Sequence, residues 1–284
     1  MSSLDSSTRN LGRFPARIHV LLARDTPDAV VIRRGPARQV AIVGWDRSTD
    51  QFRVGQWLRG RIYERRCDLS PDGKHLIYFA MGTPRAPQTK ATWTAISRAP
   101  YLKARAFWSK GDAWAGGGMF LSSETYWLNR SCTETLEWDD TGLTQQAEYP
   151  WHEGYGGECP GVYYIRLQRD GWALKHSAPG RGGTVSTFDK PLKGHWTLRK
   201  MAFATTQTKP GTGCYFDEHQ LVNTRTGAVE NYEEWEWADH DGDRLMWAEA
   251  GCLYAGRLSD GGPAEVRMLY DFTPLTFENL TAPY

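Results

Sequence analysis

The stretch Arg66-Cys-Asp-Leu-Ser-Pro-Asp-Gly-Lys-His-Leu-Ile-Tyr78 decides the fold class of this 284-residue chain. Its Asp72-Gly73 pair supplies the positive-φ positions that a tight hairpin turn requires, and Pro71 fixes φ at the entry to the turn. Apolar and aromatic residues on both sides are typical of β-strands. The stretch therefore predicts two short antiparallel strands joined by a tight turn.

A second stretch, Trp237-Ala-Asp-His-Asp-Gly-Asp-Arg-Leu-Met-Trp247, has the same pattern. Both stretches place Asp-Gly before two polar residues, then Leu, an apolar residue and an aromatic residue. Weaker echoes of the turn fall near residues 111, 140 and 170. Repeated units of this kind cover both faces of each small sheet when the sheets are stacked radially. The repetition therefore predicts that several small sheets form a series.

Residues 66–80 resemble the repeat of TolB-like and WD-repeat-like β-propellers, whose hallmark is Ser-Pro-Asp-Gly-Lys followed by an apolar strand. Residues 237–247 are similar, with Asp-His in place of Ser-Pro. The resemblance implies an all-β fold, a single β-propeller of about five to seven blades of short antiparallel strands. We expect a disordered tail over residues 1–12 and the propeller over residues 13–284, in which Gly161–Leu167 is predicted to be a strand.

The composition agrees with this fold class. The chain has 13 Trp, 13 Tyr and 10 Phe, and aromatic side chains favour strands. No run of about 18 apolar residues occurs, which predicts no membrane span. The polar N-terminal residues lack the apolar core of a secretory signal, so we expect a cytoplasmic protein. The five cysteines form no Cys-x-x-Cys pair, and neither a cofactor nor a metal is expected.

Charge is distributed unevenly along the chain. Residues 1–66 contain thirteen Arg and six acidic residues, whereas residues 217–243 contain nine acidic residues and one Arg. In a closed propeller the first and last blades are neighbours, so we expect these two regions to pair. The arginines are scattered through predicted strands without a nucleic-acid-binding motif, so binding to nucleic acid is not expected.

Two segments are candidate surfaces for a partner protein. Trp and Tyr are enriched at interface hot spots, and carboxylates beside them would attract a basic partner. The alternative interpretation is a solvated outer strand for the first segment and a loop that caps the core for the second. The candidate residues are Glu230, Tyr232, Glu233, Glu234, Trp235 and Glu236 in the first segment, and Trp151, His152, Glu153 and Tyr155 in the second.

The run Asp239-His-Asp-Gly-Asp243 resembles a calcium loop because carboxylates alternate along it. It lacks a downstream ligand at the usual spacing, and it lies where the repeat requires a turn. We therefore interpret it as a turn.

Two functions of different class remain open. The first is a non-catalytic protein-binding propeller, for example a bacterial immunity protein that neutralises a toxin. The second is a propeller hydrolase or lyase that acts on a sugar or a small ester. Its acids and histidines would come from several blades, with Glu153, Glu158, His152 and Asp217 as candidates. Fold alone does not decide between them. The first function has no catalytic residues, and the oligomeric state is not predicted.

Overall fold

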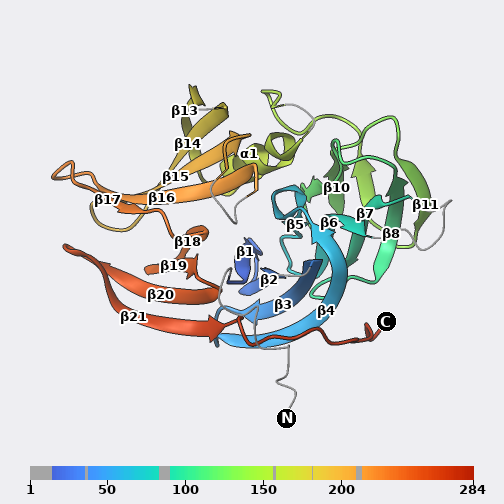
Figure 1. Ribbon diagram of the computed structural model, residues 1–284, viewed down its shortest axis with the longest axis horizontal. Helices are drawn as coiled ribbons and strands as arrows, with labels where there is room; N and C mark the ends of the chain where they lie inside the picture. Colours follow the sequence, from blue (N-terminus) through green and yellow to red (C-terminus); the bar gives the residue numbers. More distant parts are fainter. Residues whose placement is uncertain (1–14, 36–37, 83–89, 156–157, 181, 209–212) are drawn as a thin grey trace, which may run out of the picture.

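The computed structural model describes residues 15–35, 38–82, 90–155, 158–180, 182–208 and 213–284 (Figure 1). These residues form β-strands, nearly all paired antiparallel, and one α-helix, so the predicted all-β fold class is confirmed. The expected tail over residues 1–12 lies outside the described ranges. Within those ranges, no helix is long and apolar enough to cross a membrane.

The first two structural units share one continuous sheet. The first unit consists of β1 (Arg17–Leu22), β2 (Asp28–Gly35), β3 (Gln39–Asp46) and β4 (Gln51–Ile62). The second unit consists of η3 (Glu64–Arg66), β5 (Asp68–Leu69), β6 (His75–Gly82), β7 (Thr92–Arg98), β8 (Ala104–Lys110) and β11 (Thr135–Asp139). Strand β4 joins them because it pairs with β3 as far as Arg59 and with β6 from Gly60 onward.

Three further units follow. The third combines a small sheet with the helix: β9 (Gly118–Phe120), β10 (Thr125–Leu128), β12 (Thr144–Gln146) and α1 (Cys159–Arg169). The fourth consists of β13 (Ala173–Gly180), β14 (Gly183–Pro191), β15 (Trp196–Thr205), β16 (Tyr215–Asn223) and β17 (Val229–Tyr232). The fifth consists of β18 (Trp237–Asp241), β19 (Arg244–Glu249), β20 (Cys252–Ser259) and β21 (Gly262–Asp271).

Hydrophobic clusters between the units close the chain into a ring. One cluster joins the first unit to the second, and another joins β6–β8 to β9 and β10. Further clusters join β9 and β10 to α1, and α1 to the fourth and fifth units. A last cluster joins β18–β20 back to β1–β3. Each unit therefore packs on the next and the last packs on the first, which is the closed arrangement of a β-propeller.

Both strong copies of the motif form the predicted turns. Gly73 has φ of 74° between β5 and β6, and Gly242 has φ of 59° between β18 and β19. Asp72 accepts hydrogen bonds from the Ser70 hydroxyl (2.6 Å) and from the Lys74 amide (3.2 Å). Asp and Gly therefore serve turn geometry in both copies, as the sequence predicts. The echo near residue 170 differs, because Gly171 (φ 90°) follows the end of α1 and does not close a hairpin.

The predicted strand over Gly161–Leu167 is wrong, because these residues belong to α1. Val162 and Ile165 pack toward β9 and β10, while Tyr163 and Leu167 pack toward the fourth and fifth units. A helix that is buried on two sides shows no polar stripe, and its apolar run cannot be told from a buried strand by periodicity.

Ion pairs across the closure of the ring confirm the predicted pairing of basic and acidic regions. Glu236 accepts a hydrogen bond from the Ile18 amide (2.9 Å) and lies 3.5 Å from Arg17 Nε. Arg47 pairs with Asp241 at 3.0 Å. The N-terminal arginines therefore contact the acidic region because the first and fifth units are neighbours.

Candidate functional site

All five units contribute side chains to one pocket at the centre of the ring, which we call the central pocket. Its volume is about 520 Å³. The charged and aromatic side chains that line it are His19, Arg24, Arg47, Asp68, Tyr163, Arg166, Arg169, Asp170, Trp172, Lys190, Lys200, Trp237, Asp239, His240 and Asp241. Six of these carry a Lys or Arg charge and four carry a carboxylate. The lining therefore has an excess of two positive charges.

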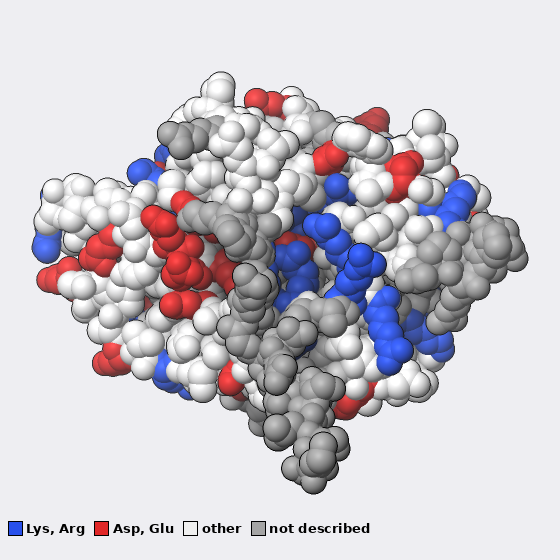
Figure 2. Space-filling view, in the orientation of Figure 1, with Lys and Arg blue, Asp and Glu red and all other residues white. Residues whose placement is uncertain are grey.

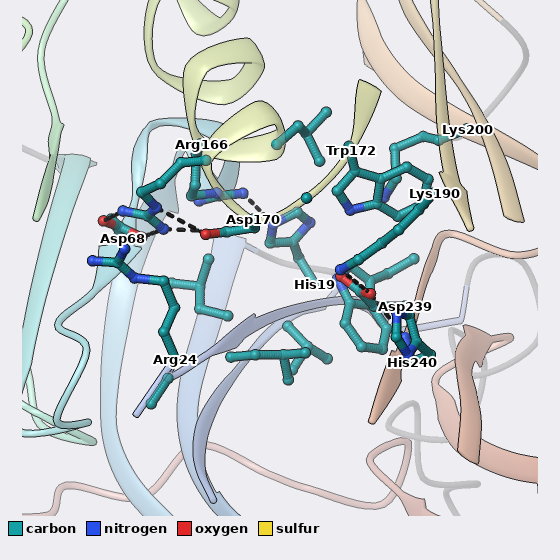
Figure 3. Close-up of a pocket in the computed structure, with 18 of the residues that line it drawn as sticks. His19, Arg24, Asp68, Arg166, Asp170, Trp172, Lys190, Lys200, Asp239 and His240 are labelled. Carbon is teal, nitrogen blue, oxygen red and sulfur yellow. Dashed lines mark hydrogen bonds and ion pairs between the residues drawn. The ribbon is translucent and has the colours of Figure 1, made fainter. Parts of the chain in front are cut away.

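The four carboxylates of the central pocket are all paired with cations in its wall. Arg169 binds Asp68 through two hydrogen bonds (2.6 and 2.9 Å) and also contacts Asp170 at 2.8 Å. Lys190 lies 2.7 Å from Asp239, as drawn in Figure 3, and Asp241 is paired with Arg47. These pairs neutralise the four carboxylates. The other cations of the lining have no carboxylate partner among the described residues.

Arg166 is one of these remaining cations. Its side chain comes from the buried side of α1, and the residue is 5% exposed. The guanidinium donates to the Cys67 carbonyl and lies 2.9 Å from His19 Nε2. Within the described ranges, no carboxylate lies at ion-pair distance from it. Arg166 therefore holds a buried positive charge beside the pocket.

Lys200, from β15, is the second cation without a carboxylate partner. It is 2% exposed, and its ammonium lies 4.7 Å from the centre of the Trp172 ring. Figure 3 shows both side chains at one side of the central pocket. Burial lowers the pKa of Lys200 to about 8, and Arg65 and Arg166 add to this effect, although Asp217 and Asp239 oppose it. Among the residues that the structure describes, no carboxylate or hydrogen-bond acceptor contacts Nζ.

Near Lys200, the protein interior holds a buried ion pair. Arg65 Nη2 lies 2.5 Å from Asp217, and the Tyr163 hydroxyl donates to the other oxygen of Asp217 at 2.6 Å. Burial alone would raise the pKa of Asp217, but Arg65 and Lys200 lower it below its ordinary value. Asp217 is thus an ionised partner for Arg65.

Two buried histidines stay neutral in this region. Burial lowers the pKa of His219 to about 3, with Lys200 contributing. Its Nδ1 lies 2.8 Å from the Trp235 carbonyl, so Nδ1 carries the proton, while Nε2 has no partner in the described part of the chain. Burial and Arg166 hold the pKa of His19 well below its ordinary value. A neutral His19 can accept the hydrogen bond of Arg166 at Nε2.

The first predicted surface segment is only partly exposed. Trp235 is 3% exposed and its ring lies between those of Tyr232 (3.9 Å) and Trp247 (4.9 Å). The Trp235 ring therefore belongs to the hydrophobic core, where it is stacked with the rings of Tyr232 and Trp247, and it offers no surface to a partner. Glu236 is occupied in closing the ring. Glu233 and Glu234 are exposed, and Glu230 and Tyr232 are half-buried and joined by a 2.6 Å hydrogen bond.

The second predicted segment is a loop before α1. His152 and Glu153 are exposed, and Trp151 and Tyr155 are half-buried. Tyr155 donates to Glu153 at 2.8 Å and accepts from Gln168 at 3.0 Å. Trp151 and Tyr155 pack against the cluster between α1 and the strands β9 and β10. The two half-buried rings therefore cover the core, as in the alternative interpretation of this segment.

The four residues considered for catalysis do not form one site. Asp217 is buried with Arg65, whereas His152 and Glu153 are on the exposed loop. Glu158 precedes α1, where it accepts a hydrogen bond from Tyr215 and lies 3.9 Å from Arg66. None of the four lines the central pocket.

The loop Asp239–Asp243 is the predicted turn. Its three carboxylates are each paired with a different basic residue: Asp239 with Lys190, Asp241 with Arg47, and Asp243 with Lys193. Within the described ranges, no group of three or more His, Cys, Asp or Glu side chains could hold a metal ion.

No sequence pattern pointed to the central pocket, since each unit contributes only one or a few of its residues. A usable signal was a cation inside an apolar run. Arg166 interrupts the apolar run Val-Tyr-Tyr-Ile before Leu167, whereas Lys200 follows Arg199 and shows no such signal. Lys and Arg are almost never buried without a partner, so such positions indicate a site.

Comparisons with known proteins give only distant structural likenesses. No protein-family model matches the chain, and no curated protein sequence matches it. A mutant of the GH43 protein BlXynB from Bacillus licheniformis is 11% identical with a TM-score of 0.34, over 95% of this chain and 60% of that chain. Saccharomyces cerevisiae Sqt1 is 11% identical with a TM-score of 0.30, over 90% of this chain and 86% of that chain. A prolyl endopeptidase is 8% identical with a TM-score of 0.28, over 85% of this chain and 47% of that chain. These values carry no argument about function.

Proposed function

We propose that the protein is a binding module that holds a small anionic ligand, bearing a carboxylate, phosphate or sulfate group, in the central pocket. One observation carries this proposal. Lys200 and Arg166 are buried cations beside the same pocket, and neither has a carboxylate partner in the described part of the chain. A buried charge without a counter-charge is costly. An anionic ligand would provide the missing charge at a place where the low dielectric strengthens the attraction.

The arrangement of the pocket carboxylates favours binding over acid–base hydrolysis. A general acid must hold a proton before it can protonate a leaving group. Asp68, Asp170, Asp239 and Asp241 each pair with Arg or Lys. Burial alone would raise the pKa of Asp239, but Lys190 holds it below its ordinary value. The hydrolase or lyase alternative therefore has less support from this pocket.

Ligand-induced stabilisation tests the proposal. The probes are inorganic phosphate, sulfate and citrate at neutral pH, with sodium chloride at matched ionic strength as the reference. We expect at least one probe to raise the melting temperature of the wild-type protein, since a ligand that binds only the folded state stabilises it. The Lys200→Met variant should fold and should bind that probe roughly tenfold or more weakly by calorimetry.

Lys193→Met is the matched control. Lys193 is exposed, belongs to the same unit and is paired with Asp243 outside the central pocket. We expect it to bind the probe like the wild type. The proposal fails if no probe stabilises the protein beyond sodium chloride, or if the two lysine variants lose affinity equally.

Binding to a basic partner protein, such as the toxin expected in the immunity hypothesis, remains a second proposal. Its support is an acidic surface: Figure 2 shows Asp and Glu side chains gathered over the part of the ring that holds β17 and β18, and Glu233 and Glu234 are exposed there. The partner should bind the wild type and lose affinity for a chain with Glu233→Gln and Glu234→Gln. Equal binding by both chains would exclude this surface.

A further inference from the structure

A second basic site lies away from the central pocket, where β4 passes from one unit to the next. We call it the arginine groove. It is a cavity of about 710 Å³ lined by Arg34, Gly35, Arg38, Gln39, Val40, Arg59, Gly60, Arg61, Met81, Gly82 and Ala91. Four of these residues are arginines and none is acidic. The groove therefore has a stronger charge imbalance than the central pocket.

The geometry of β4 explains why the arginines converge. Arg59 is the last residue of β4 paired with β3, opposite Gln39, and Gly60 is the first paired with β6, opposite Gly82. Arg59 and Arg61 are two positions apart and so project from the same face of the strand, about 6.8 Å apart along it. Arg38, which directly precedes Gln39 in the chain, completes the rim.

The three outer arginines are exposed and have no acidic partner. Arg38, Arg59 and Arg61 are all exposed, and no carboxylate of the described residues lies at ion-pair distance from any of them. Arg59 lies over the Phe277 ring at 4.3 Å, and Arg61 lies over the Tyr63 ring at 4.4 Å. Stacking on a ring orients a guanidinium but leaves its N–H donors available.

Deeper in the groove, one buried donor is unsatisfied. Arg34 pairs with Glu64 at 2.7 Å, yet its Nε is buried and has no hydrogen-bond partner within the described ranges. The lining also includes Gly35, Gly60 and Gly82, where a Cβ atom would meet other protein atoms, which are the Arg33 side chain, the Met81 carbonyl and the Trp93 ring. The three exposed arginines at the rim indicate an anion with more than one charged group.

We propose that the arginine groove binds a short single-stranded phosphodiester chain, RNA or DNA. Arginine matches phosphate oxygens with two parallel hydrogen bonds. Arg59 and Arg61 lie on one face of β4, about 6.8 Å apart along it, so one phosphodiester chain could contact both. The rings of Tyr63 and Phe277 hold the guanidinium groups of Arg61 and Arg59 in place, because each arginine lies over one of them. The fold gathers arginines that are scattered in the sequence, and for this reason the proposal departs from the expectation that nucleic acid is not a partner.

Fluorescence polarisation with labelled oligo-dT and oligo-U tests this inference. We expect binding at low salt that weakens as salt rises. The double variant Arg59→Gln and Arg61→Gln should bind about tenfold more weakly, and the slope of log affinity against log salt should fall by roughly 0.7 for each phosphate that is no longer neutralised. Absence of binding by the wild type at low salt would overturn the proposal.

Two controls separate this groove from other basic surfaces. Arg53 is exposed on the same strand and also lies over an aromatic ring, Tyr101, but outside the groove, so Arg53→Gln should bind like the wild type. Lys200→Met should also bind normally, because the central pocket is a different site. Loss of binding in either control, or displacement of the oligonucleotide by polyglutamate at equal charge concentration, would contradict a phosphodiester-specific groove.

Discussion

The central pocket and the arginine groove are both basic, but they use charge in opposite ways. The pocket gathers side chains from all five units, and each of its four carboxylates pairs with Arg or Lys, which leaves Arg166 and Lys200 without a carboxylate partner in the described part of the chain. The groove gathers exposed arginines from β4 and the turn before β3, and none of the described residues that line it is acidic. Buried charges are coupled to folding, whereas exposed charges are screened by water and salt. Changes in the centre should therefore affect stability and pH response, and changes in the groove should affect salt-dependent binding alone.

The largest expected effect comes from breaking the buried ion pair near Lys200. Asp217→Ala leaves Arg65 buried without its counter-charge and removes the acceptor of Tyr163. We expect a loss of about 3–5 kcal/mol in the free energy of unfolding, measured by urea denaturation. Arg61→Gln in the groove should change it by less than about 0.5 kcal/mol. Similar losses of unfolding free energy in both variants would contradict the difference between the buried charges of the centre and the exposed charges of the groove.

Acidic pH should lower the unfolding free energy through the buried groups at the centre of the ring, and it should leave the arginine groove unchanged. The pKa of His219 is about 3 in the folded protein, against an ordinary value of 6.5. The unfolded chain therefore binds an additional proton below pH 6.5, and stability falls as the pH falls from that value toward 3. Between pH 6.5 and 5 we expect His219 alone to cost about 2 kcal/mol.

The variant His219→Gln keeps a donor for the Trp235 carbonyl but cannot titrate. Over this range, its unfolding should take up about one proton fewer than that of the wild type, so its unfolding free energy should depend less on pH. Urea denaturation at several pH values measures this difference. His19 remains to titrate in this variant, so some acid sensitivity should persist. An unchanged pH dependence would mean that His219 is not the neutral buried histidine described above.

The sequence predicted the repeat unit and the closed ring for a clear physical reason. An Asp-Gly turn between apolar strands is a local signal, and the turns at Gly73 and Gly242 depend on few distant contacts. The pairing of Arg47 with Asp241 followed from ring closure. Helix α1 was missed because its formation depends on packing against β9 and β10 and against the fourth and fifth units, which the local pattern does not contain.

Neither site could be predicted in the same way. Lys200 and Arg166 are single residues on different elements, brought together only by the ring. The groove needs β4 to change its partner from β3 to β6 at Gly60, where Arg38, Arg59 and Arg61 line it together. Conversely, Trp235 looked like a surface residue because acidic neighbours surround it in sequence, although its ring is stacked in the core.

Alkaline pH gives the smallest effect and the sharpest separation of the two sites. Lys200 has a pKa of about 8 in the unliganded protein, so at pH 9 only about one lysine in eleven remains charged. A neutral amine no longer attracts an anion, so affinity for the anion in the central pocket should fall by about tenfold from pH 7 to pH 9. The groove arginines keep their charge over this range, and oligonucleotide affinity should stay constant. Calorimetry at the two pH values measures the affinity for the anion, and fluorescence polarisation measures the affinity for the oligonucleotide. A parallel loss at both sites would place the titrating group outside Lys200, and constant anion affinity would mean that Lys200 does not contact the ligand.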